Sequence, residues 1–95
     1  MERRVLKSER KLDIKLDSRF AVVVLKNGSM IGFTTFGKAE QYAKAQVRRG
    51  MWTEYGSVYI TVSAVPIAYI NRDSRDRVWT DMTDSSPALI RGLGI

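Results

Sequence analysis

The sequence predicts an α+β fold, in which an antiparallel sheet of four or five strands carries one helix across one face. The run FAVVVL at 20–25 is rich in β-branched residues and precedes an Asn-Gly pair, which is typical of a β-hairpin. Between Phe36 and Val47 the apolar residues recur at spacings of three and four, which is the period of a helix. Alternating segments after this helix give the order strand, strand, strand, helix, strand, strand.

Three strands are expected before the helix. Residues 12–17 alternate apolar and polar side chains, which predicts a half-buried first strand. The run 20–25 is apolar on both faces, and we therefore place it in the centre of the sheet. A two-residue type I′ turn at 27–28 would pair Leu25 with Met30 in the returning strand.

The helix is predicted over residues 37–49. Thr35 or Gly37 can cap its N-terminus, and Gly50 is well placed to cap its C-terminus. Glu40 and Lys44 are four residues apart in the favourable order, so we expect an ion pair on the exposed face.

The remaining strand signals include two backbone breakers. Gly32, inside the returning strand, marks a bulge or a close approach by another layer. Residues 58–64 alternate strictly, and 67–70 resume as a strand after Pro66, which must lie at a bulge, a bend or an edge. Residues 77–80 could add a short edge strand.

The chain is expected to form one domain with two extensions. Residues 1–11 read as a basic arm or a short frayed helix, residues 12–80 as the α+β domain, and residues 81–95 as a loop followed by an apolar tail. The charge is uneven, because residues 1–50 carry a net +7 and residues 51–95 a net −1. This asymmetry suggests an anionic partner at the N-terminal side, although a positive charge also serves solubility alone.

The residue types present argue against an enzyme. The chain has no His and no Cys, which removes the commonest general base, the usual zinc ligands and the thiol nucleophile. Asp73, Asp76, Asp81 and Asp84 do not follow the spacing of a calcium loop, and neighbouring arginines are expected to pair with the acids of the turn. We therefore expect no catalysis, no cofactor, no metal and no small-molecule substrate.

No segment of the sequence predicts membrane insertion or export. The longest apolar run, 20–25, is far shorter than the roughly 20 residues of a membrane helix. No apolar stretch follows the charged start, as a secretory signal requires. The expected location is the cytoplasm, or the host cytoplasm or virion if the chain is phage-encoded.

Basic residues combined with an aromatic side chain form the candidate polyanion site. Cations beside a stacking platform are the general means of binding single-stranded nucleic acid or a phosphate backbone. A packing role under the end of the helix is the alternative for the aromatic residue. The candidate contacts are Arg3, Arg4, Lys7, Lys15, Lys26, Lys44, Arg48, Arg49 and Trp52.

The stretch FAVVVLKNGSMIGFTTFGKAEQYAKAQ, residues 20–46, resembles the hairpin-and-helix unit of the arm-type DNA-binding domains of phage integrases. The resemblance implies that the exposed sheet face, with Lys15 and Lys26, enters a DNA groove. The chain departs from that family in continuing through further strands, and no recombinase domain follows. Small accessory proteins of phages share the same pattern, so no family is assigned.

The functional hypothesis is a small, non-catalytic interaction protein, of the kind that serves phages as an accessory or assembly component. Its partner would be another protein or a second copy of the chain, held by the apolar tail. Docking of this tail on its own domain is one alternative, and nucleic-acid binding through the basic side is the other. The candidate docking residues are Leu89, Ile90, Leu93 and Ile95.

Overall fold

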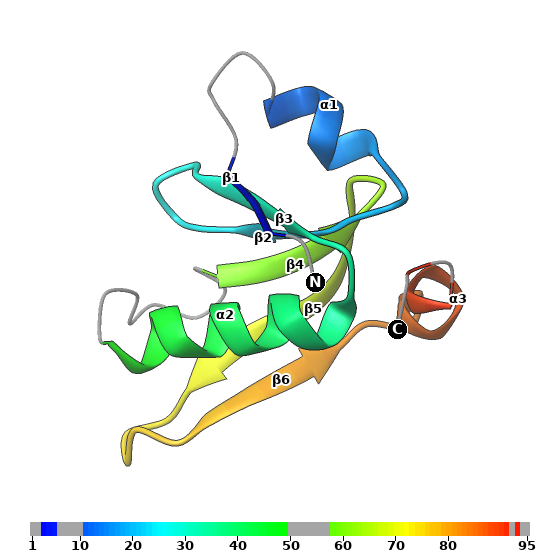
Figure 1. The fold of residues 1–95 in the computed structure, drawn as a ribbon. Helices are drawn as coiled ribbons and strands as arrows, with labels where there is room; N and C mark the ends of the chain where they lie inside the picture. Colours follow the sequence, from blue (N-terminus) through cyan, green and yellow to red (C-terminus); the bar gives the residue numbers. More distant parts are fainter. Residues whose placement is uncertain (1–2, 6–10, 50–57, 92, 94–95) are drawn as a thin grey trace.

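The computed structural model describes residues 3–5, 11–49, 58–91 and 93. Six strands and three helices form in these residues (Figure 1). Their bounds are β1 (Arg3–Val5), α1 (Lys11–Leu16), β2 (Ala21–Val24), β3 (Met30–Phe33), α2 (Phe36–Arg48), β4 (Val58–Val62), β5 (Val65–Arg72), β6 (Val78–Met82) and α3 (Ser86–Ile90).

The strands form one antiparallel sheet in the order β1-β3-β2-β4-β5-β6. The long helix α2 crosses one face of this sheet, and the short helix α1 lies on the other (Figure 1). The α+β class, the antiparallel sheet and the single main helix are therefore confirmed. The strand β2 is central and all four of its residues are buried, as its apolar run predicted.

The first strand differs from the prediction. Residues 12–17 were expected to be extended, but α1 ends at Leu16, and the strand that pairs with the outer side of β3 is β1, inside the predicted arm. A short alternating segment fits either structure, and here the helix places Ile14 over the sheet. A Cβ atom at Gly32 would lie 2.7 Å from Ile14 Cδ1, so this glycine marks a close approach, one of its two predicted roles.

The β2–β3 turn has three residues and not two. Leu25 N–H donates to the Ser29 carbonyl and Gly28 N–H donates to the Leu25 carbonyl, each at a donor–acceptor distance of 2.9 Å. Gly28 alone in this turn has a positive φ, 88°. This is the geometry of a type I turn followed by a left-handed residue. As a result Val24 pairs with Met30, one residue away from the predicted register.

The two-residue turn with positive φ lies elsewhere, at Ser63 and Ala64, where φ is 52° and 67°. It joins β4 to β5. The break between these two strands was expected at Pro66, whereas the first strand ends at Val62 and the second already begins at Val65. After the turn the pairing of β4 with β5 skips Ile67. Thr61 pairs with Pro66, whereas the preceding residue of β4, Ile60, pairs with Ala68. Pro66 thus lies beside a bulge, one of the three positions predicted for it.

Helix α2 is built largely as predicted. The Thr35 side chain caps it by accepting a hydrogen bond from the Lys38 N–H over 3.3 Å. Gly50, the predicted C-terminal cap, lies outside the described residues. The helix buries a face rich in small residues, which lets it lie close to the sheet. The buried residues of α2 are Ala39, Ala43, Gln46 and Val47.

Two apolar clusters hold the layers together. The larger lies between α2 and the sheet and draws on β2 to β5. The smaller lies on the other face, where α1 and the segment before β2 cover β2 and β3, and consists of Ile14, Phe20, Val22 and Val24. Within the described ranges no helix is long and apolar enough to span a membrane.

Candidate functional site

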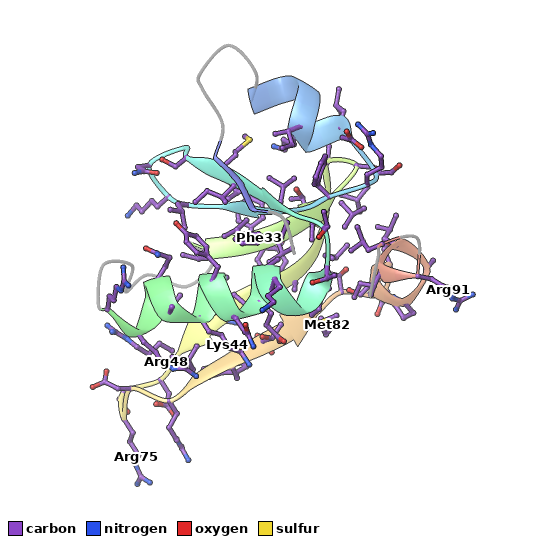
Figure 2. All side chains as sticks on the ribbon, viewed as in Figure 1. Phe33, Lys44, Arg48, Arg75, Met82 and Arg91 are labelled. Atoms are coloured by element: carbon purple, nitrogen blue, oxygen red, sulfur yellow. The ribbon has the colours of Figure 1, made fainter. Side chains whose placement is uncertain are left out.

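The C-terminal end of α2 lies beside the turn between β5 and β6. Arg72 connects them, because its Nη1 donates to the Val47 carbonyl over 3.2 Å and its Nε lies 3.6 Å from Asp76 Oδ1. The last carbonyls of a helix lack an intrahelical donor, and a cation near them is stabilising. Figure 2 shows Arg48 of the helix and Arg75 of the turn at this same end of the molecule.

Asp73 holds the β5–β6 turn in shape. Its Oδ1 accepts hydrogen bonds from the backbone N–H groups of Arg75 and Arg77, both at a distance of 2.9 Å. Its Oδ2 accepts one from Arg77 Nε at a distance of 2.8 Å. The Arg77 N–H, aided by the Arg77 guanidinium and the Arg75 N–H, lowers the pKa of Asp73 below its ordinary value of 3.8, against an opposing effect of burial. The turn is therefore fixed while Asp73 is ionised.

We call this region the arginine end, defined as Arg48, Arg49, Arg72, Arg75 and Arg77. With Asp73 and Asp76 it holds five cations against two anions, a net charge of +3. Arg72 and Arg77 are paired with these acids. Among the described residues, the side chains of Arg48, Arg49 and Arg75 form no ion pair, and all three residues are exposed. Three guanidinium groups are thus available to a ligand.

Most of the predicted basic contacts lie elsewhere. Arg3 and Arg4 belong to β1, at the opposite edge of the sheet from β6. Lys15 belongs to α1, on the face opposite α2, and Lys26 is exposed in the β2–β3 turn. The predicted set is therefore not one surface. Two of its members lie outside the described residues, namely Lys7 and Trp52.

The remaining predicted contacts are on α2. Lys44 Nζ lies 3.6 Å from Glu40 Oε2, which confirms the expected ion pair and partly neutralises this cation. Arg48 and Arg49 are exposed at the end of the helix, as predicted. Of the nine predicted contacts, these two alone belong to the arginine end.

The sheet face required by the integrase-like interpretation is covered over β2 and β3. Helix α1 brings Ile14 against Gly32, and Phe20 packs beside it on the same face. Lys15 is part of this covering helix and not of an exposed strand. Entry of this part of the sheet into a DNA groove would require α1 to leave it, so the structure gives that interpretation no support.

The apolar tail packs on its own domain. Leu89 and Ile90 of α3 are partly buried against the main core cluster, and Leu93 is 5% exposed. This arrangement matches the predicted alternative, in which the tail docks on its own domain. Ile95 lies outside the described residues.

Hydrogen bonds from Thr83 and Ser86 hold α3 in place. The Ser86 hydroxyl donates to the Ile67 carbonyl, and the Thr83 hydroxyl donates to the Pro66 carbonyl over 3.0 Å. The Thr83 N–H also donates to the Ile67 carbonyl over 3.0 Å. Ser86 is 1% exposed, which is unusual for a residue in a segment predicted to be a loop. The bulge in β5 thus provides the acceptors that anchor α3.

Sequence reasoning missed the contribution of the β5–β6 turn to the basic surface. The expected pairing of its acids with arginines is confirmed for Arg77 with Asp73 and for Arg72 with Asp76. It is wrong for Arg75, whose side chain forms no ion pair among the described residues and is exposed. Nothing in the sequence indicates that this turn lies beside the end of α2, because that depends on how the helix crosses β5. In the part of the chain that the structure describes, no group of three or more acids could hold a metal ion.

Comparison with known proteins finds no family model, no curated protein and no solved structure that matches this chain. A function for this chain is therefore inferred from the geometry of the arginine end.

Proposed function

We propose that this chain is a small, non-catalytic nucleic-acid-binding protein that contacts phosphates through its arginine end. The observation that supports the proposal is the presence of three exposed arginines, Arg48, Arg49 and Arg75, without an ion pair in the described structure. The net charge of +6 and the pI of about 10.0 add a general attraction for polyanions. A cytoplasmic setting would give the chain access to nucleic acid.

Arginine suits this role for a chemical reason. Its planar guanidinium donates two parallel hydrogen bonds to a phosphate, which a lysine ammonium does not do. Arg72 and Arg77 are occupied by Asp76 and Asp73 and would keep the turn and the helix end in place. The five arginines thus divide into two that position the surface and three that contact the ligand. Contacts to phosphate alone predict affinity with little dependence on base sequence.

The test is fluorescence anisotropy of labelled single-stranded and duplex DNA and RNA over a series of salt concentrations. If Arg48, Arg49 and Arg75 each neutralise one phosphate, log K against log salt on duplex DNA has a slope of about −2.7. The double variant Arg48→Gln/Arg75→Gln should then reduce the magnitude of the slope by about 1.8 and weaken binding for all sequences alike.

A matched control removes the same charge from the other end of the molecule. Lys38→Gln/Arg91→Gln lowers the net charge by the same amount, and both residues are exposed away from the arginine end (Figure 2 labels Arg91). Its salt slope should stay close to that of the wild type. Equal losses in the two double variants would show attraction by net charge alone, and no binding at low salt would refute the proposal.

A protein partner, in the manner of a phage accessory or assembly component, is the second candidate. The route through the tail has lost support, because Leu89, Ile90 and Leu93 pack against the chain's own core. What favours a protein partner instead is strand β6, which has no neighbouring strand on its outer side among the described residues and carries two exposed apolar side chains, Trp79 and Met82. Replacing either with Lys should abolish complex formation in a pull-down, whereas Val65→Lys should not.

A further inference from the structure

The two edges of the sheet differ in how they are protected. Edge strands usually carry charged residues, proline or a bulge that discourage pairing with another strand. At one edge, β1 has only three residues, two of which are arginines. At the other, β6 has five residues, Val-Trp-Thr-Asp-Met, and pairs with β5 without any irregularity. By sequence and by register, β6 lacks most of these protections.

The backbone groups of β6 that face outward follow from its pairing with β5. Asp73 N–H donates to the Arg77 carbonyl and Thr83 N–H to the Ile67 carbonyl, so residues 77 and 83 are turned toward β5. In an antiparallel strand the backbone N–H and C=O groups of every second residue point to the same side, so those of residues 79 and 81 are directed at β5 as well. The N–H and C=O groups directed at the free edge are those of Val78, Thr80 and Met82.

The side chains of β6 also leave apolar surface uncovered. Trp79 is 40% exposed and Met82 is 48% exposed, and alternation along the strand places them on opposite faces of the sheet. The Trp79 indole N–H donates to Asp81 Oδ1 over 3.0 Å, which holds the aromatic ring beside that carboxylate. Apolar surface therefore flanks a row of free backbone groups on both sides.

We propose that β6 pairs antiparallel with β6 of a second copy of this chain, about a two-fold axis through Thr80. In this register the outward backbone groups of one strand meet those of the other, at Val78 with Met82 and at Thr80 with Thr80. On the opposite face of the sheet from Thr80, Trp79 of one copy lies opposite Asp81 of the other. The register that satisfies the hydrogen bonds therefore does not place like charges opposite each other. Apolar pairs and Thr–Thr pairs across strands are favourable.

Neighbouring registers are less favourable. Moving the axis by one residue toward the C-terminus places Asp81 opposite Asp81, which brings two like charges together. Moving it by one residue toward the N-terminus leaves Met82 without a partner in the strand. In the register centred on Thr80 the Glu40 carboxylate lies close to the axis, because the Thr80 hydroxyl donates to it over 2.7 Å. Lys44, at 3.6 Å from Glu40, reduces the repulsion between the two carboxylates.

Self-complementarity selects a second copy as the occupant. The described sheet of each copy has one edge of this kind, so a two-fold pairing closes and does not continue into a filament. A contact made mainly by two five-residue strands falls below the roughly 1,200 Å² of a standard interface. We therefore expect a weak dimer with a dissociation constant in the micromolar range.

Sedimentation velocity of the wild-type chain from about 5 µM to about 500 µM gives the first test, because a weak dimer in the expected affinity range becomes populated over this interval. The sedimentation coefficient should rise with concentration toward the value of a dimer. A monomer at every concentration would overturn the proposal and would leave β6 to a strand from another protein. This outcome is independent of nucleic-acid binding, which is measured on the arginine variants.

A single introduced cysteine tests the register, and the natural chain contains no Cys to interfere. Opposed Cα atoms of a hydrogen-bonded antiparallel pair lie about 5.5 Å apart, within disulfide range, so Thr80→Cys should oxidise to a covalent dimer. In Met82→Cys the two thiols would be about 14 Å apart, four positions along the strand. Disulfide formation at least tenfold faster in Thr80→Cys supports the proposed axis, and equal rates would overturn it.

Discussion

The two ends of the molecule use their polar groups in opposite ways, although both are anchored on β5. At the α3 end, the hydroxyls of Thr83 and Ser86 are satisfied by carbonyls of the bulge in β5. At the arginine end, Arg72 of β5 is paired, while three neighbouring arginines have no acidic partner in the described structure. The α3 end therefore uses its polar groups to hold the fold together, whereas the arginine end has three exposed cationic side chains that form no ion pair among the described residues.

The largest expected effect is on stability at the α3 end. Leu93 is 5% exposed and packs in the main core cluster. Leu93→Ala should lower the free energy of unfolding by about 2–3 kcal/mol, because it removes buried apolar atoms and leaves a cavity. Urea denaturation followed by circular dichroism measures this change. The control is Leu16→Ala, since Leu16 is 56% exposed, and equal small losses in the two variants would mean that the tail is not docked.

The second effect concerns the buried hydroxyl that anchors α3. Ser86→Ala leaves the Ile67 carbonyl without the Ser86 donor and should cost about 1–2 kcal/mol of stability. The matched control is Ser85→Ala, because Ser85 is exposed and makes no side-chain capping bond. Nucleic-acid affinity should be unchanged in both variants. A loss of affinity in folded Ser86→Ala would contradict the separation of the two ends.

A smaller effect is expected from the pH dependence of the arginine end. The pKa of Asp73 is lowered in the folded chain from its ordinary value of 3.8, so its ionised form stabilises the turn. This contribution is present above the ordinary value and is lost as the pH falls through the lower, folded-state pKa. Wild-type stability should therefore fall more steeply than that of Asp73→Asn between about pH 5 and about pH 2. Parallel curves would show that Asp73 is not held by its neighbours.

The smallest effect on stability is expected from the exposed arginines of the arginine end. Arg48→Gln/Arg75→Gln should change the free energy of unfolding by less than about 0.5 kcal/mol, because both residues are exposed and unpaired in the described structure. Thermal unfolding of the double variant beside the wild type tests this. A large destabilisation would mean that these arginines serve the fold and are not reserved for a ligand.

The β2–β3 and β5–β6 turns are of the same type, but only in the first does the sequence identify the left-handed residue. In β2–β3 the left-handed residue is Gly28, and in β5–β6 it is Asp76, with φ of 62°. Asp76 N–H donates to the Asp73 carbonyl just as Gly28 N–H donates to that of Leu25. A glycine in the sequence indicates a left-handed position. An aspartate does not, because aspartate also occurs in many solvated loops.

The layers of the fold were predictable for a related reason. The periodicity of α2 and the β-branched run of β2 are long enough to fix both elements. The six-residue α1 is not, since its alternation fits a strand equally well and only its packing over Gly32 decides. The candidate site was predicted in part, at Arg48 and Arg49. The contribution of Arg75 depends on a contact between α2 and β5 that no local pattern encodes.

The most direct measurement of the proposed function is the salt slope of nucleic-acid binding by the arginine variants. The arginine end predicts a slope of about −2.7 on duplex DNA for the wild type and about −0.9 for Arg48→Gln/Arg75→Gln, with Lys38→Gln/Arg91→Gln close to the wild type. Binding that does not depend on salt, or that both double variants weaken equally, would contradict the assignment of this end as the phosphate-binding surface.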